Sequence, residues 1–480
     1  MQIVRRDVLS KFAGEFLSRL VFLLFFFYVG RKVGTVDFGT LNLAISVTYI
    51  LGVVFLDPGL NLSTIQLLVE RQDHAKQIAG SIFSAKLLLF VPTLIVLGVL
   101  SATLGDRLPS AFVLFLSALY TLFTVVLEYL SSVTNAFHRM DIEAILKIVN
   151  RMLIVLLAAV ALRVGHVVPL LTAMVLATFL SSAFAWLLLG KRLIWVTPQW
   201  DFEVVKQAFR IGFPIAGAVI VGVIYLKWDL LVLSYFQIGR EQIGWYAGGY
   251  KIVEAFFALP GILGAGLFPL MVELYKRDQG SLGRLLGLTV KGGVLFAIPI
   301  AATVSLLSRQ VMLLVYGATF VPGASVLAIL IWCIVPMFLY CYLVFVNIAA
   351  GHAIHNLWAG CTALVVGLVA NAILVPRVGY LGAAWAALAA NTAFAALATW
   401  RVCSVFRNAR LPALLVRLMA SGAVMVAIFF FTPASVSLQL VLGLLAYVVL
   451  LVSLGTLGAG DLSLAMRLLA FRTQPQAQQP

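Results

Sequence analysis

Charged residues are scarce in this sequence. Only 11% of its 480 residues are Asp, Glu, Lys or Arg, whereas 63% are hydrophobic, and the mean hydropathy is +1.08. A typical soluble domain has roughly 45–50% apolar and about 25% charged residues. The composition therefore excludes a water-soluble fold. Apolar stretches recur with short gaps along the whole chain, which predicts one continuous membrane domain of the all-α class.

Features of catalytic and cofactor-dependent proteins are also missing from the sequence. The four cysteines lie in apolar segments without a CxxC pair, which predicts buried thiols and no metal or cofactor. No GxxxxGK[ST] loop occurs, and no soluble segment is large enough for an ATPase. The longest predicted outer loop, 307–323, holds one charged residue, Arg309. We therefore predict no enzyme, with a membrane-embedded glycosyltransferase or ligase as a remote alternative. Transport would use an ion gradient, the membrane potential or the substrate's own gradient.

The apolar segments and the basic residues together predict a topology. About fourteen segments between Leu9 and Leu457 are long enough to cross the bilayer, which requires about 20 apolar residues each. With the N-terminus inside, 22 of the 33 Lys and Arg residues fall in predicted cytoplasmic segments and 7 in outer loops. The net charge of +15 thus reflects membrane topology, and we predict no nucleic-acid partner. Both termini are expected in the cytoplasm.

An internal repeat is indicated by three landmarks that recur in order. The pairs are Gly39 with Gly244, Asn135 with Asn347, and Arg163 with Arg377, at offsets of 205, 212 and 214 residues. Two like-oriented six-helix bundles with two appended C-terminal helices would follow, and the substrate path would lie between the bundles. The predicted parts are an N-terminal bundle (1–190), a cytoplasmic linker (191–210), a C-terminal bundle (211–403), two extra transmembrane helices (404–460) and a disordered cytoplasmic tail (461–480).

Ionisable residues inside the spans are the candidate site residues, because a charge at the bilayer centre costs about 2.5 to 3.5 kcal/mol. Lys11, Glu15 and Arg19 share one face of the first span. Lys227 and Asp229 point about 200° apart on a helix, so at least one needs a partner on another helix. The predicted lining of a central, substrate-binding cavity is Arg19, Glu15, Lys227, Asp229, Lys251 and Glu254. Its cations would attract an anionic head group. The alternative is that these charges only pin helices together.

Four further residues have predicted roles in coupling and movement. Glu128 and Asp57 are candidates for carrying a coupling proton, although Asp57 is also placed as a helix-end residue before Pro58. Pro260 and Gly261 form a candidate hinge. Lys86 is expected to snorkel towards the membrane surface.

Several segments resemble a known family. They are Asp37–Gly39 (DFG), Ile243–Tyr246 (IGWY) and Pro376–Ala386 (PRVGYLGAAWA). In this order, within a twelve-plus-two arrangement of spans, they are similar to the Wzx-type polysaccharide-biosynthesis flippases of the multidrug/oligosaccharidyl-lipid/polysaccharide (MOP) superfamily. The resemblance covers nearly the whole chain.

The resemblance implies two six-helix bundles that flip an undecaprenyl-pyrophosphate-linked oligosaccharide, such as an O-antigen, capsule or exopolysaccharide repeat unit, across a bacterial inner membrane by alternating access. It also implies a polysaccharide polymerase and glycosyltransferases as partners. Two alternatives share the fold. A lipid II flippase would carry more cavity arginines than Arg19 alone, and a cation-coupled multidrug exporter would use buried carboxylates such as Asp229, Glu254 and Glu128.

Overall fold

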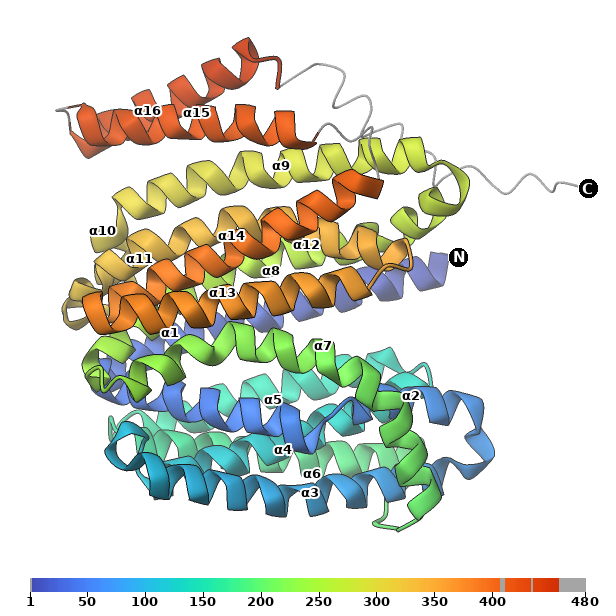
Figure 1. The fold of residues 1–480 in the computed structure, drawn as a ribbon. Coiled ribbons are helices and arrows are strands. Elements are labelled where there is room, and N and C mark those ends of the chain that lie inside the picture. The colour runs from blue at the N-terminus through green and yellow to red at the C-terminus, as the bar shows by residue number, and fades with distance from the viewer. Residues whose placement is uncertain (1, 406–410, 433–434, 457–480) are drawn as a thin grey trace, which may run out of the picture. The chain divides into compact units, whose positions relative to one another are not determined.

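The computed structural model describes residues 2–405, 411–432 and 435–456, and every secondary-structure element within these ranges is helical (Figure 1). Side chains at 2–20, 214, 215, 218, 258, 262, 405, 411, 412 and 430 lie outside the description. Contacts group the chain into two compact units. Unit 1 contains 1–248, 312–323 and 371–383, and unit 2 contains 249–311, 324–370 and 384–480. The predicted tail, 461–480, falls outside the described residues.

Unit 1 is formed mainly by the first seven helices and the start of the eighth. Their bounds are α1 Gln2–Leu51, a π-helical turn Gly52–Leu56, α2 Leu60–Glu70, α3 Ala75–Leu104, α4 Ala111–Ala136, α5 Met140–Ala161, α6 Val167–Arg192, α7 Phe202–Tyr235 and α8 Arg240–Arg277. Short 3-10 turns follow α2 and α3. Helix α4 packs extensively on α6, and α7 packs on α1, α2 and α3.

Unit 2 begins within α8 and holds most of the later helices. Their bounds are α9 Gln279–Leu306, α10 Ser308–Tyr316, α11 Ala324–Leu330, α12 Ile334–Ala349, α13 Ile354–Val378, α14 Tyr380–Val405, α15 Leu411–Phe431 and α16 Val436–Ser453. Parts of α10, α13 and α14 belong to unit 1. Helices α15 and α16 form a hairpin, and α15 also packs on α9.

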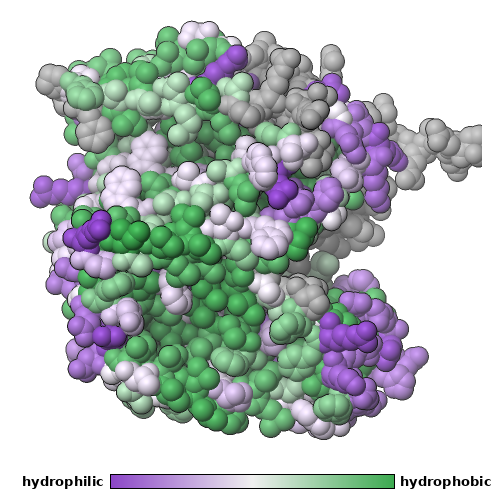
Figure 2. Space-filling model, in the orientation of Figure 1, coloured by the Kyte–Doolittle hydropathy of each residue, from purple (hydrophilic) through white to green (hydrophobic). Residues whose placement is uncertain are grey.

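Membrane crossing is supported by the length and composition of the helices. Within the described residues, eleven helical segments are apolar and long enough to span a bilayer, and a shorter apolar helix covers Ala413–Phe429. Over α3 to α6, the face shown in Figure 2 is hydrophobic in its middle and hydrophilic towards the helix ends. The chain is therefore a multi-pass membrane protein. The predicted count of fourteen is not confirmed: one candidate segment, 21–70, covers the second predicted span and part of the first, and α7 is not among the eleven.

The helix that holds the second predicted span, 38–60, is broken near the end of that span. After a kink at Gly34, α1 continues to Leu51 and gives way to the π-helical turn, and α2 starts only at Leu60. Pro58 and Gly59 occupy the gap. Gly59 has a positive φ of 77°, and a Cβ at this position would collide with the backbone of Gly212 in α7. Close approach of α7 therefore requires a glycine at the break.

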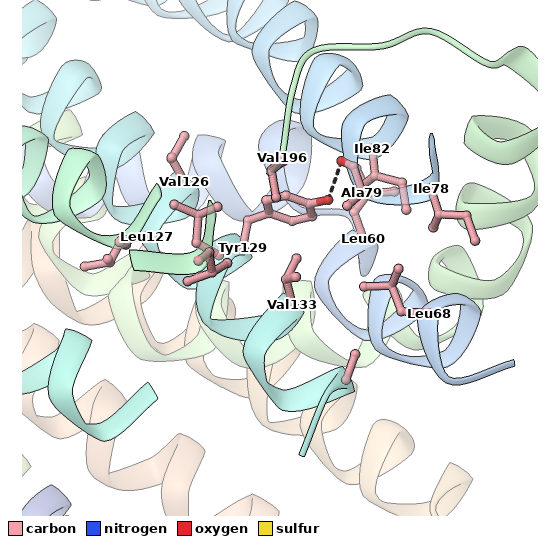
Figure 3. Close-up of a cluster of buried hydrophobic side chains, with 14 of the residues drawn as sticks. Leu60, Leu68, Ile78, Ala79, Ile82, Val126, Leu127, Tyr129, Val133 and Val196 are labelled. Atoms are coloured by element: carbon pink, nitrogen blue, oxygen red, sulfur yellow. Dashed lines mark hydrogen bonds between the residues drawn. The ribbon is translucent and has the colours of Figure 1, made fainter. Parts of the chain in front are cut away.

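A buried hydrophobic cluster supports this break from one side (Figure 3). It joins residues of the six helices from α2 to α7 with Val196, which follows α6. Tyr129 lies at its centre, is fully buried, and donates its hydroxyl hydrogen to the carbonyl oxygen of Ala79 over 2.6 Å. This hydrogen bond gives a partner to a hydroxyl that burial would otherwise leave unpaired. It also fixes the position of α4 along α3.

Two helix-ending motifs recur and support the predicted repeat. After α4, His138 has a positive φ of 56° and the amide of Arg139 bonds the carbonyl of Thr134. After α12, Gly351 has a φ of 76° and the amide of His352 bonds the carbonyl of Asn347. Both are left-handed C-terminal caps, and they lie 213 residues apart. Positive φ also recurs 214 residues apart, at Gly165 (76°) and Gly379 (61°).

The connection between α6 and α7 is packed within unit 1. Helix α7 begins inside the predicted linker, so the extended connection is limited to residues 193–201. Trp186 donates its indole hydrogen to the carbonyl of Val196 over 2.7 Å. Asp201 caps α7 and accepts a hydrogen bond from the side chain of Gln77 on α3, at 2.6 Å. These contacts fix the start of α7 against α3 and α6.

Candidate functional site

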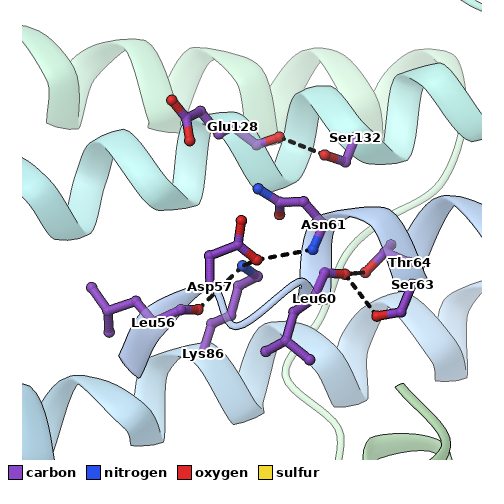
Figure 4. A network of polar contacts seen from close by, with 9 residues as sticks. All are labelled: Leu56, Asp57, Leu60, Asn61, Ser63, Thr64, Lys86, Glu128 and Ser132. Carbon is purple, nitrogen blue, oxygen red and sulfur yellow. Dashed lines mark hydrogen bonds and ion pairs between the residues drawn. The ribbon is translucent and has the colours of Figure 1, made fainter. Parts of the chain in front are cut away.

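Asp57 lies at the break in the second span and has two functions there. Its Oδ1 accepts the backbone amide hydrogen of Asn61 at 2.9 Å, which caps the first turn of α2. The same oxygen accepts a hydrogen from Lys86 Nζ on α3, also at 2.9 Å (Figure 4). Asp57, for which both a coupling role and a helix-end role were predicted, therefore links the π-helical turn to α3 and caps the start of α2.

Lys86 does not snorkel as the sequence suggested. Its side chain is 1% exposed. Besides Asp57, the ammonium donates to the carbonyl oxygen of Leu56 at 3.3 Å, and it lies 5.6 Å from the centre of the Tyr129 ring. Snorkelling requires a path to the membrane surface, whereas here a carboxylate, a freed carbonyl and a ring face satisfy the charge locally. The result is a buried ion pair.

Glu128 on α4 faces the same network. Its carboxylate interacts electrostatically with Asp57, Lys86, Lys147 and Arg151, which brings the two predicted coupling residues into one charged group. The side chain is exposed in the structure, in contrast to Lys86. Glu128 is therefore the accessible member of the network and Lys86 the enclosed one.

Lys147 and Arg151 were counted with a cytoplasmic segment, but α5 contains both. Arg151 lies eleven residues after Met140, about 16 Å along the helix. Its guanidinium stacks 3.7 Å from the centre of the Phe22 ring on α1, and Lys147 pairs with Glu143 at 2.8 Å. Their spacing of four residues places Glu143, Lys147 and Arg151 on one face of α5. Both residues also fall inside the predicted fifth span, 142–162, so the sequence already placed them among the intramembrane charges.

Asp229 on α7 is held by two other helices. Its Oδ2 accepts a hydrogen from the Tyr246 hydroxyl on α8 at 2.6 Å, and its Oδ1 accepts from the side-chain amide of Asn371 on α13 at 2.9 Å. Because Lys227 and Asp229 point in different directions on α7, at least one of them needed a partner on another helix. Asp229 has two such partners. Asn371 is 1% exposed. The sequence signal for this partner was an asparagine within an apolar stretch of the predicted eleventh span, which was not included among the predicted site residues.

Lys251 and Glu254 form an ion pair within α8. Their charged atoms are 2.7 Å apart, and the side chains are 18% and 41% exposed. Both residues belong to unit 2, whereas Lys227 and Asp229 belong to unit 1, as Asp57 and Glu128 do. Lys227 is half-buried. The predicted central cavity that would unite these residues stays a prediction.

The remaining predicted residues lie on α1 and α8. Glu15 and Arg19 are on the helical part of α1, but their side chains lie outside the described residues. Helix α8 continues through Pro260 and Gly261 to Arg277. Pro260 is buried, and a Cβ at Gly261 would meet no atom within 4 Å. The hinge stays a prediction.

Comparison with known protein families identifies the family of this chain. Residues 4–275, more than half of the chain, match the family described as polysaccharide biosynthesis protein. The chain belongs to the polysaccharide biosynthesis protein family. No sequence among curated proteins matches it.

Solved structures of MOP-superfamily transporters share the fold. The lipid II flippase MurJ in an inward closed conformation matches with a TM-score of 0.73 and 15% identity, over 92% of this chain and 98% of that chain. An inward-facing multidrug resistance MATE family transporter matches at 0.61 and 15%, over 87% and 100%. A MOP-superfamily transporter from Pyrococcus furiosus matches at 0.54 and 15%, over 84% and 95%. At such identities the likeness establishes the fold.

Proposed function

We propose that this member of the polysaccharide biosynthesis family flips an undecaprenyl-pyrophosphate-linked oligosaccharide from the cytoplasmic to the periplasmic leaflet of a bacterial inner membrane, by alternating access. Both termini would lie in the cytoplasm, and a polymerase and glycosyltransferases would act beside it. The observation that carries the proposal is the family match over 4–275, combined with ionised side chains inside apolar helices of that same region.

Charge chemistry supports an anionic substrate. Lys227 lies eight residues, about 12 Å, before the end of α7, and Arg151 lies well inside α5. Intramembrane cations of this kind usually face a wet path or a bundle interior, because lipid rejects them. A pyrophosphate group offers several acceptor oxygens for charge-assisted hydrogen bonds. We therefore assign head-group attraction to Arg19, Lys227 and Lys251, with Arg151 added from its place in α5.

Charge reversal tests the proposal. Lys227→Glu or Arg19→Glu is expected to trap lipid-linked oligosaccharide on the cytoplasmic face and to remove most surface glycan, measured by leaflet-specific labelling and glycan blots. Lys206→Glu is the matched control, since Lys206 is on the same helix but 65% exposed. The control should leave glycan unchanged. Normal surface glycan in Lys227→Glu, at wild-type protein level, would contradict an anion path through this residue.

A cation exporter is the second candidate, and Asp229 favours it. The hydrogen bonds that Asp229 accepts come from neutral donors, Tyr246 and Asn371, so its negative charge is available to an organic cation. The exporter predicts that expression raises resistance to organic cations and that Asp229→Asn abolishes this resistance. The flippase predicts no such resistance and a glycan defect instead. A lipid II flippase would show itself by a peptidoglycan defect.

A further inference from the structure

The break between the π-helical turn and α2 has the chemistry of a cation site that a side chain already fills. Lys86 Nζ lies 2.9 Å from Asp57 Oδ1 and 3.3 Å from the carbonyl oxygen of Leu56. Both oxygens accept hydrogens from the ammonium (Figure 4). Since the Lys86 side chain is 1% exposed, the positive charge is enclosed by protein.

The backbone geometry explains why an oxygen is free at this position. The amide of Asp57 closes the π turn on the carbonyl of Gly52, at 3.0 Å. In a continuing π helix, the amide of Asn61 would meet the carbonyl of Leu56, but it bonds Asp57 Oδ1 instead. The carbonyl of Leu56 is thus released from the helix and accepts from Lys86. An unwound carbonyl of this kind is what discontinuous membrane helices use to coordinate Na⁺.

The side chain of Asn61, whose backbone amide bonds Asp57, carries a further oxygen at the break. The Asn61 side chain lies beside Asp57 in Figure 4, and its Oδ1 is buried and has no hydrogen-bond partner among the residues that the structure describes. Carbonyl, carboxylate and amide oxygens are the ligands that hard cations select. The break therefore presents two oxygens that contact the Lys86 ammonium and a buried third oxygen on Asn61. The cation that these two contacts place there is the one tethered to Lys86.

We propose that the ammonium of Lys86 is a tethered replacement for a monovalent metal cation at this break, so that neither Na⁺ nor K⁺ binds here or drives transport from this site. The groups that act on the ammonium are Asp57 and Glu128, together with the ring face of Tyr129. The assignment of the site does not depend on the transported substrate. Only its consequence for energy coupling rests on the proposed function.

Removing the lysine should expose the site to metal cations. In Lys86→Ala the carboxylate of Asp57 keeps its place, the carbonyl of Leu56 loses its donor, and the volume of the lysine side chain is vacated. The variant is expected to bind Na⁺, which would restore the missing charge. The wild-type protein should show no such preference, because Lys86 occupies the position.

Thermal unfolding of the purified full-length protein in detergent tests this, followed by tryptophan fluorescence. NaCl and KCl are exchanged for N-methylglucamine chloride at constant ionic strength. In Lys86→Ala, Na⁺ should raise the unfolding midpoint by about 2 to 5 °C over N-methylglucamine, as a ligand bound only by the folded state does. The wild-type midpoint should not respond. The double variant Asp57→Asn/Lys86→Ala should also be indifferent to Na⁺, because the anionic ligand is gone.

Each other outcome overturns the assignment. A folded Lys86→Ala whose midpoint is the same in Na⁺, K⁺ and N-methylglucamine has no cation site at the break. A Lys86→Ala protein that stays unfolded when Na⁺ is present throughout extraction is equally contrary, since bound Na⁺ should rescue it. A response to Na⁺ that survives in the double variant would place the site elsewhere. None of these measurements uses a lipid-linked substrate, so a failure here is distinct from a failure of the flippase proposal.

Discussion

Two ion pairs of similar length lie in different settings. Lys86 and Asp57, 2.9 Å apart, join α3 to a break in another span, and the lysine is 1% exposed. Lys251 and Glu254, 2.7 Å apart, lie one turn apart on the continuous α8, and this lysine is 18% exposed. Distance is therefore a poor guide to what the pairs do. The Lys86–Asp57 pair holds α3 against the π-helical turn and the start of α2, whereas the Lys251–Glu254 pair connects neighbouring turns of α8 only.

Removing the anion of the enclosed pair should have the largest effect. Asp57→Ala leaves the Lys86 ammonium buried without its carboxylate and also removes the cap of α2. Breaking a buried pair from one side costs about 3 to 5 kcal/mol of unfolding free energy. Chemical unfolding in detergent measures this loss. A loss as small as that of Lys251→Met, below, would erase the difference between the two pairs.

A second variant separates the charge of the enclosed pair from its packing support. Tyr129→Phe keeps the ring near Lys86 but removes the hydrogen bond to the carbonyl of Ala79. A net loss of about 1 to 2 kcal/mol is expected for one buried hydrogen bond. The same unfolding assay checks it, and the ion pair should persist. A loss equal to that of Asp57→Ala would mean that the tyrosine, and not the pair, holds the break.

An exposed carboxylate outside the spans gives a third, smaller effect with a defined pH range. Asp278 caps α9, and the Ser281 hydroxyl, followed by the Ser281 amide, holds the pKa of that carboxyl below its usual value. Because the folded-state pKa is lowered, the stabilisation is present near neutral pH and is lost as pH falls through the folded-state pKa.

Asp278→Asn should therefore unfold at a lower temperature than the wild-type protein near neutral pH. The two melting curves should converge below about pH 4, where the carboxyl protonates in the unfolded chain and then in the folded one. Melting curves between neutral and acid pH measure the convergence. A difference that grows on acidification would have the wrong sign for a carboxyl with a lowered pKa.

The pair on α8 should respond least. Lys251→Met removes a contact between two partly exposed side chains one turn apart on the same helix, and such pairs contribute about 0 to 1 kcal/mol. The unfolding free energy should hardly change, while glycan export falls if the proposed head-group attraction operates at this residue. Export measured at matched protein level decides between the two roles. Unchanged export would leave Lys251 as a helix-surface residue only.

The sequence predicted the helical membrane fold because that follows from composition and segment length, which are local properties. The Lys251–Glu254 pair was equally accessible, since a spacing of three residues on one helix is enough to bring side chains together. The partners of Asp57 and Asp229 were not predictable in this way. Lys86 and Asn371 are 29 and 142 residues away, and only tertiary packing brings them near.

The break itself was also beyond the sequence pattern. Pro58 and Gly59 suggested a helix end at Asp57, but the π turn before them has an ordinary apolar sequence, GVVFL. A regular helix was assumed there, and Lys86 was given a path to the surface that the structure does not provide. Errors of this kind arise where backbone geometry departs from the α-helical repeat.

The π-helical turn at Gly52–Leu56 acts like a one-residue insertion. A π turn accommodates one residue more than an α turn, and each residue on a helix advances the side-chain direction by about 100°. Deleting a single residue from this stretch would close it into an ordinary α turn and swing Asp57 away from α3. The half-helix beyond it would then be rotated as a body, with every side chain still present and every one facing a different neighbour.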